Sequence, residues 1–333
     1  MKKIMLLGVS FLFLFLLVGC GKYDEKDVLK DLSNKINKAG SYYLEGKMEI
    51  YNNEDVYKYD VTVSYQEEDF FRVSLKNTSN NHEQIILKNE DGVYVLTPSL
   101  NKTFKFQSEW PYNNSQVYLF QSILNDIKED EGKEFKEDDK YYIFTTTVNY
   151  PHNRNLKKQV IYLDKKINFK EIHVVDENNN PQIKMKFTNI DMKATFKNDY
   201  FALDKNMETA IVDDAVKPVV SIDEIIYPMY IPAETYLSNN ESITKSNGER
   251  IMLNFDGTSP FLLVEETVEI SDEFEVVPTY GEPIQIADTV GSISEGTISW
   301  HSNGIEYYIV SDVLSQIDLL DVARSISVIP VVK

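Results

Sequence analysis

Cysteine is almost absent from this 333-residue chain, which contains only Cys20. A chain with a single thiol can form neither an internal disulfide nor a site in which several thiolates bind a metal. The four histidines, His82, His152, His173 and His301, stand apart and fit no H-x-H or H-E-x-x-H spacing. The sequence therefore predicts no metal site, and packing must stabilise the folded state.

The sequence also lacks the short motifs that mark common enzymes. It contains no G-x-S-x-G, G-x-x-x-x-G-K-[ST] or G-x-G-x-x-G pattern. Acidic clusters such as "QEED" at 66–69 could supply a carboxylate pair, but charges in turns and on outward strand faces are usually solvated. We therefore expect no catalytic residue, no cofactor and no enzymatic activity.

Positive charge is scarce as well. The chain has 53 acidic residues against 34 lysines and arginines, which gives a formal net charge of -19. Nucleic acids and anionic lipid surfaces attract basic proteins, so this balance argues against a nucleic-acid partner and against electrostatic docking on a flat membrane.

One long apolar run is present, and it lies near the start of the sequence. Lys2 and Lys3 precede an uncharged stretch from Ile4 to Val18, after which the chain turns polar. This layout is typical of a secretory signal peptide. The run is shorter than the roughly 20 residues that cross a bilayer, so a retained transmembrane anchor is the weaker interpretation.

The lone cysteine ends this run in the sequence "LVGC", residues 17–20, which resembles a bacterial lipobox. That resemblance implies removal of residues 1–19 and a diacylglycerol on the Cys20 thiol, with residues 20–24 as a lipidated tether. Two or three acyl chains hold a protein stably on a membrane. We expect a lipid-anchored protein on the extracytoplasmic face of the cell membrane. The alternative is an ordinary signal followed by a buried cysteine.

The remaining pattern is that of a long antiparallel sheet with few helices. Apolar residues at helical spacing predict helices within 24–40 and 115–130. Period-two alternation between Asn-rich turns predicts strands. These expected strands are 42–50, 57–65, 70–76, 84–88, 93–97, 102–107, 141–148, 158–164, 169–176 and 182–189.

A second, smaller unit is expected after the alternation lapses near residues 205 to 218. We predict a first domain over 25–207, a linker over 208–217 and a small α+β domain over 218–333. The small domain should have three to five strands, in the segments 250–257, 261–270, 291–304 and 305–312. A helix from Val313 to Ile326 should follow, capped by Ser311 or Asp312.

Strand parity predicts an apolar cavity in the first domain. A register that buries one side-chain set exposes the other, so Thr62, Ser64, Arg72, Ser74 and Lys76 should lie on the outer face. The helix within 115–130 should cover the inner face. The expected lining is Leu44, Met48, Val61, Val63, Val73, Leu75, Phe106, Phe120 and Leu124.

The stretch "EDFFRVSLKNTSNNHEQIILKNEDGVYVLTPSLNKTFKFQSEWPY", residues 68–112, resembles the central hairpins of the LolA-like superfamily. With the lipobox and the second unit, the chain most resembles the YdcC-type sporulation lipoproteins and, more loosely, the germination lipoprotein GerS. The resemblance implies a mainly β, incomplete antiparallel barrel with a helical lid, followed by a small α+β domain. It also implies a cavity for lipid or acyl chains.

Two functions are consistent with these features. The barrel could bind or sense a lipid or acyl ligand in sporulation or in the spore envelope. Alternatively, it could be a non-catalytic scaffold that docks another exported protein, such as a cell-wall hydrolase or an anti-sigma partner. The volume inside the barrel separates these hypotheses, because a bound ligand needs space that a packed scaffold lacks.

The lipobox prediction is tested by Cys20→Ser. This change removes the thiol that would carry the diacylglycerol, so labelling with a fatty-acid analogue should be lost and the protein should leave the membrane fraction. Unchanged labelling and fractionation would contradict the prediction.

Overall fold

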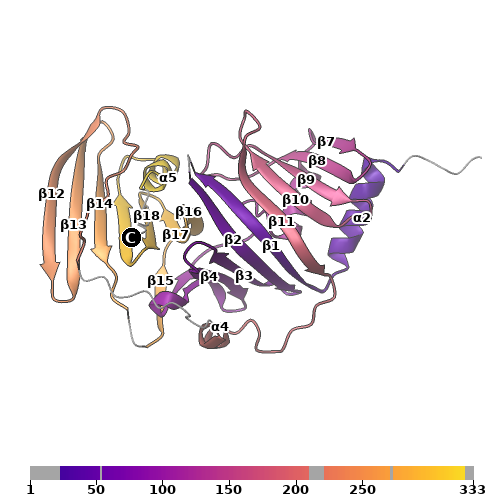
Figure 1. The fold of residues 1–333 in the computed structure, drawn as a ribbon, viewed down its shortest axis with the longest axis horizontal. Helices are drawn as coiled ribbons and strands as arrows, with labels where there is room; N and C mark the ends of the chain where they lie inside the picture. The colour runs from indigo at the N-terminus through magenta and orange to yellow at the C-terminus, as the bar shows by residue number, and fades with distance from the viewer. Residues whose placement is uncertain (1–22, 53–54, 210–220, 271–272, 327–333) are drawn as a thin grey trace, which may run out of the picture.

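A computed structural model describes residues 23–52, 55–209, 221–270 and 273–326, and Cys20 lies outside these ranges. Two sheets lie side by side along the long axis of the molecule (Figure 1). The larger sheet has the order β15-β6-β5-β4-β3-β2-β1-β11-β10-β9-β8-β7. Its strands are β1 (Ser41–Asn52), β2 (Asp55–Gln66), β3 (Phe70–Asn77), β4 (Glu83–Asn89), β5 (Gly92–Thr97), β6 (Lys102–Phe106), β7 (Glu134–Glu137), β8 (Tyr141–Thr147), β9 (Lys158–Asp164), β10 (Phe169–Val175), β11 (Pro181–Asp191) and β15 (Glu275–Thr279).

The smaller sheet belongs to the C-terminal part of the chain and has the order β12-β13-β14-β19-β18-β17-β16. Its strands are β12 (Thr235–Lys245), β13 (Gly248–Gly257), β14 (Phe261–Thr267), β16 (Glu282–Ile286), β17 (Thr289–Ser294), β18 (Thr297–Ser302) and β19 (Ile305–Val310). The helices are α2 (Glu25–Asn37), α3 (Phe120–Glu129), α4 (Leu203–Thr209) and α5 (Gln316–Arg324), with a short 3-10 turn, η2, at Pro98–Leu100.

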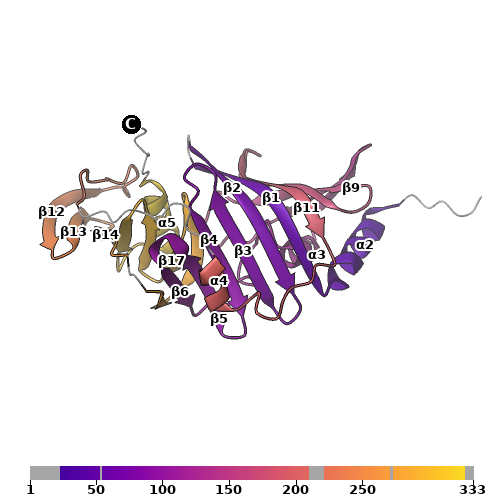
Figure 2. The same ribbon diagram turned by 60° about the horizontal axis from the view of Figure 1, so that its bottom comes forward.

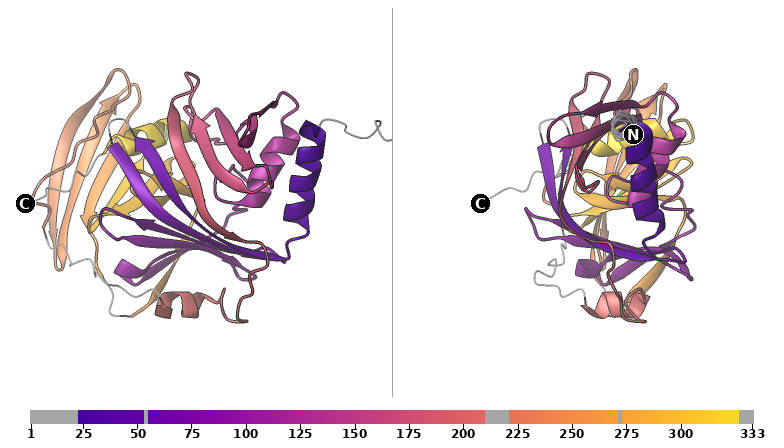
Figure 3. Two further views of the ribbon diagram at one scale, coloured as in Figure 1. Left: turned by 45° about the vertical axis from the view of Figure 1, so that its right-hand side comes forward. Right: turned by 90° about the vertical axis from the view of Figure 1, so that its right-hand side faces the viewer.

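The larger sheet curls but does not close, because its end strands β7 and β15 are not paired with each other. Figure 3 shows the curled sheet wrapping around the helices on its concave side. The predicted incomplete antiparallel barrel with a helical lid is therefore confirmed. One connection is different: β15, from the C-terminal part, pairs in parallel with β6 and extends the edge of the first sheet.

Helices α2 and α3 close the concave face. Asp24 and Asp27 form a reciprocal capping box that fixes the start of α2, and Val28, Leu32 and Ile36 are buried on one side. The second predicted helix is shorter than expected, since α3 begins only at Phe120. The preceding segment instead pairs with a loop, where the Ser115 backbone N–H donates to the Asn149 carbonyl over 2.8 Å.

The outer face of the sheet is not fully exposed, which corrects the parity prediction. Ser64 and Ser74 are buried. The chain after β11 returns under β3 to β5 and ends in α4 (Figure 2). There the Ser64 hydroxyl contacts that of Tyr200 at 2.9 Å, and Arg72 Nε donates to Asn206 Oδ1 over 2.6 Å. The predicted polar face thus became a second packing surface.

Two predictions for the C-terminal unit were wrong. Its sheet has seven strands rather than three to five, since β12 and β16 went unrecognised. Strand β12 is Asn- and Ser-rich and almost wholly exposed, so its sequence shows no alternation between apolar and polar residues. The helix α5 begins at Gln316 and is capped by Ser315, whereas Ser311 accepts hydrogen bonds from two backbone N–H groups in the turn before it.

Packing inside the curled sheet predicts the response to an enlarged side chain. Val63 on β2 has no exposed surface and lies opposite Leu44 of β1 and Val73 of β3. Val63→Trp should lower the free energy of unfolding by about 1–3 kcal/mol, because a filled site must distort to admit the indole. Urea unfolding measures the loss. The control is Val56→Trp on the same strand, where the side chain is exposed; equal stability of both variants would contradict the prediction.

Candidate functional site

All nine residues predicted to line a cavity are buried in one core cluster, to which α3 contributes Phe120 and Leu124 and the strands contribute the other seven. Phe106 also lines a cavity of about 380 Å³, and Phe120 borders a small space of about 10 Å³. The other seven line neither these two spaces nor the cavity described next. The concave face is therefore packed near the helices, and spaces of about 490 and 380 Å³ lie toward the second sheet. An open, acidic space of about 580 Å³ lies outside the core, between the start of α2 and β7.

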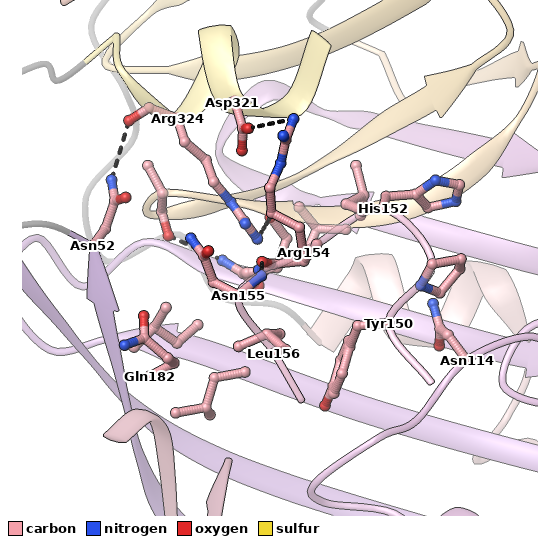
Figure 4. A pocket seen from close by; sticks show the side chains of 18 of the residues that line it. Asn52, Asn114, Tyr150, His152, Arg154, Asn155, Leu156, Gln182, Asp321 and Arg324 are labelled. Carbon is pink, nitrogen blue, oxygen red and sulfur yellow. Dashed lines mark hydrogen bonds and ion pairs between the residues drawn. The ribbon is translucent and has the colours of Figure 1, made fainter. Parts of the chain in front are cut away.

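The junction cavity, as we call the space between the first sheet and the C-terminal unit, has a volume of about 490 Å³. This volume falls in the roughly 300–1,000 Å³ range of ligand pockets. Its walls come mainly from the ends of β1 and β11, the segment 110–118, the loop 150–156 before β9, the β16–β17 hairpin and helix α5 (Figure 4). Residues from both units thus form the walls.

One wall of the junction cavity is apolar. Ile50 of β1 pairs with Ile183 of β11, and both continue the inward face that carries Leu44 and Met48. Leu156 and Ile86 extend this wall, and Trp110, Tyr118 and Val290 lie nearby. The parity of the strands therefore produces an apolar surface that runs from the packed core into the open space.

The opposite wall is polar and comes from α5. The Arg324 side chain descends from α5 toward the middle of the cavity (Figure 4). Its backbone carbonyl accepts a hydrogen bond from Asn52 Nδ2 over 3.1 Å, which ties α5 to the end of β1. Its guanidinium donates to the Gln285 carbonyl over 3.5 Å. Burial lowers the pKa of Arg324 to about 10, since a charged group loses solvation there.

A second arginine joins the two units beside this wall. Arg154, in the loop before β9, places Nη2 at 2.8 Å from Asp318 Oδ1 and 3.0 Å from Asp321 Oδ2, both on α5. Burial raises the pKa of Asp321 although Arg154 opposes the shift. Hydrogen bonding from Ser315, and then from Arg154, holds the pKa of Asp318 below its usual range. These ion pairs bridge the junction.

The cavity of about 380 Å³ lies on the other side of the junction, between β6, β15 and β17 to β19. His301 Nε2 lies 3.0 Å from Glu306 Oε1, and the His301 ring lies 5.1 Å from that of Phe104. Burial raises the pKa of Glu306, but His301, Tyr308 and Lys102 together outweigh it and the net shift is downward. Nearby, Gln84 Oε1 accepts from the Val290 N–H over 2.6 Å, which also links the units.

The junction cavity has the chemistry of a binding site. Within the described ranges no group of three or more His, Cys, Asp or Glu residues could hold a metal ion. Burial lowers the pKa of His152, the one histidine in the lining, so the neutral form is favoured near neutral pH. No helix in the described part of the chain is long and apolar enough to span a membrane. An apolar wall facing a guanidinium is suited to an amphiphilic ligand.

Sequence reasoning missed the two arginines. The chain contains four arginines, and two of them, Arg154 and Arg324, line the junction cavity. Each stands alone in its segment, so no spacing rule brings them together. The available signal was their rarity in an acidic chain.

The fold and the cavity define a two-unit protein, an open antiparallel barrel whose ligand-sized space is completed by a second sheet. Residues 1–201 match the family described as "Sporulation protein YdcC-like". The "Sporulation protein YdcC" of Bacillus subtilis (strain 168) is 33% identical over 97% of this chain and 96% of its own length. The chain belongs to the YdcC-like family of sporulation proteins.

Solved structures resemble the chain only distantly. MucB is 13% identical with a TM-score of 0.36, covering 92% of this chain and 98% of its own. The LolA superfamily protein NE2245 from Nitrosomonas europaea is 10% identical with a TM-score of 0.31, covering 54% and 98%. A chain in the structure of the CwlD amidase from Clostridioides difficile with the GerS lipoprotein is 14% identical with a TM-score of 0.23, covering 53% and 98%.

The ion pairs of Arg154 predict a salt-sensitive contribution to stability. All three side chains are partly exposed, so Arg154→Gln should lower the free energy of unfolding by at most about 1 kcal/mol at low salt. The difference should shrink in high salt, because screening weakens exposed pairs. Urea unfolding at two salt concentrations measures both effects. A loss that salt does not change would show that Arg154 stabilises the junction by packing instead.

Proposed function

We propose that this protein is a non-catalytic lipoprotein on the extracytoplasmic face of the cell membrane that binds an acyl-chain ligand in sporulation. The observation that carries the proposal is the junction cavity, whose apolar wall continues the inward face of the first sheet. Membership of the YdcC-like sporulation family supports the biological setting.

The position of the cavity fits a tethered protein. The described chain begins next to α2, and Figures 1 and 2 place α2 at one end of the molecule and the second sheet at the other. With Cys20 as the anchor, the membrane would lie on the α2 side. The junction cavity would then lie beyond the barrel core, on the far side of it from α2 and the bilayer.

The apolar wall gives a direct test of ligand binding. Ile183 borders the cavity and is only partly buried, so Ile183→Trp should fill space without overpacking the core. We expect the affinity for a fluorescent fatty-acid probe to fall at least about tenfold, because the indole occupies the volume that the chain needs. Thermal melting should show little change. Probe titration and melting of the same sample measure both effects.

The matched control is Ile243→Trp on β12, an exposed isoleucine of the second sheet that does not line the cavity. It should bind the probe like the parent protein. Lipid extraction of the membrane-derived protein provides an independent readout. If the parent protein neither binds the probe nor retains lipid, the acyl-ligand proposal fails, and the scaffold hypothesis, in which the chain docks another exported protein, takes its place.

A further inference from the structure

We infer that the junction cavity selects amphiphiles with an anionic end group, a carboxylate or a phosphate, and that Arg324 binds this group. The inference rests on the proposed function, since it assigns the polar end of the same ligand. It follows from the charges of the lining, the hydrogen bonds of Arg324 and the position of the apolar wall.

The lining holds half of the arginines of an acidic protein. Its charged residues are Arg154, Arg324 and Asp321. Arg154 is paired with Asp321 and with Asp318, so Arg324 is the cation of the lining that has no ion pair among the described residues. The chain as a whole carries -19 and only four arginines. Several side-chain amides that can donate hydrogen bonds complete the polar part of the lining, among them Asn52, Asn114, Asn153, Asn155 and Gln182.

Most hydrogen-bond donors of the Arg324 guanidinium have no acceptor among the described residues. A guanidinium carries five N–H donors in a planar fork. In the described structure, the Arg324 guanidinium donates one hydrogen bond, the long contact of 3.5 Å to the Gln285 carbonyl. Among the described residues, Arg324 makes no ion pair within 4.0 Å, and the two α5 carboxylates, Asp318 and Asp321, pair with Arg154. The planar fork matches a carboxylate or phosphate in two parallel hydrogen bonds.

Arg154 keeps the nearest acid away from Arg324. Asp321 attracts both arginines, but its Oδ2 lies 3.0 Å from Arg154 Nη2. Because Arg154 holds Asp321 and Asp318 together, the guanidinium of Arg324 remains available on the cavity side. A charge that loses solvation without a direct counter-ion is costly, and an anionic ligand would relieve this cost.

The apolar wall indicates where the apolar chain of the ligand would lie. Figure 4 shows the Arg324 side chain above Leu156 and Gln182, within the same space. Ile50 and Ile183 continue from there along the inward sheet face. A single-chain amphiphile can therefore place its charge at Arg324 and its chain along the strands.

The test compares probes with one chain length and different end groups. Dodecanoic acid, dodecyl phosphate and dodecanol compete at pH 8 with a fluorescent acyl probe on the full mature protein. The parent should prefer the two anions over the alcohol by roughly tenfold or more, since charge-assisted hydrogen bonds contribute that much. Arg324→Gln should lose this preference and still bind dodecanol. Arg324→Lys should recover part of it, because it restores the charge without the fork.

Two further variants separate a charge effect from general damage. Asp321→Asn should strengthen anion binding, because it removes the competing carboxylate while Arg154 retains Asp318. Arg250→Gln should leave the preference unchanged, since Arg250 pairs with Glu266 on the second sheet and does not line the cavity. Melting temperatures report whether each variant folds.

The outcomes distinguish this inference from the proposed function. Equal binding of dodecanol and dodecanoic acid by the parent would overturn the anionic selectivity and leave the acyl cavity intact. Competition by inorganic phosphate as strong as that by dodecyl phosphate would show that the acyl chain does not contribute to binding. It would overturn the inference of an amphiphilic ligand and indicate a site for a free anion. Failure of every chain-bearing probe to bind would overturn the proposed function itself.

Discussion

The structure depends on the strict alternation of β1, whose side chains at even positions all face the inside of the curled sheet. Leu44 and Met48 lie in the packed core. Ile50, the next residue on the inward face, lines the junction cavity. A one-residue slip would turn all three outward. The register with β2 and β11 therefore fixes both the core under α2 and the apolar wall of the cavity.

Much of the first unit could be predicted from the sequence because its signals are local. Alternation and Asn-rich turns define the hairpins, and Asp24 with Asp27 marks the start of α2. The burial of Ser64 could not be predicted, since it depends on a segment more than a hundred residues away that folds back over the outer face. Parity shows which residues share a face, but it does not show what covers that face.

The candidate site was less predictable, because it is formed by contacts between distant segments. Arg154 and Arg324 are separated by most of the second sheet in sequence, and neither belongs to a motif. The exposed strand β12 and the short strand β15, which contains Pro278, also lack the pattern from which strands are recognised. Single charges and short strands acquire their meaning only from the tertiary fold.

The pairing of β15 with β6 has a consequence for how the chain folds. As the chain is made from its N-terminus, β6 exists long before Glu275 to Thr279 can reach it, so contact order is high and this edge closes late. An open edge invites pairing with other chains. Lys102 and Lys105 on β6 are charges of the kind that discourage such pairing. These lysines thus oppose pairing with other chains at a sheet edge that must wait for the C-terminal part of the protein.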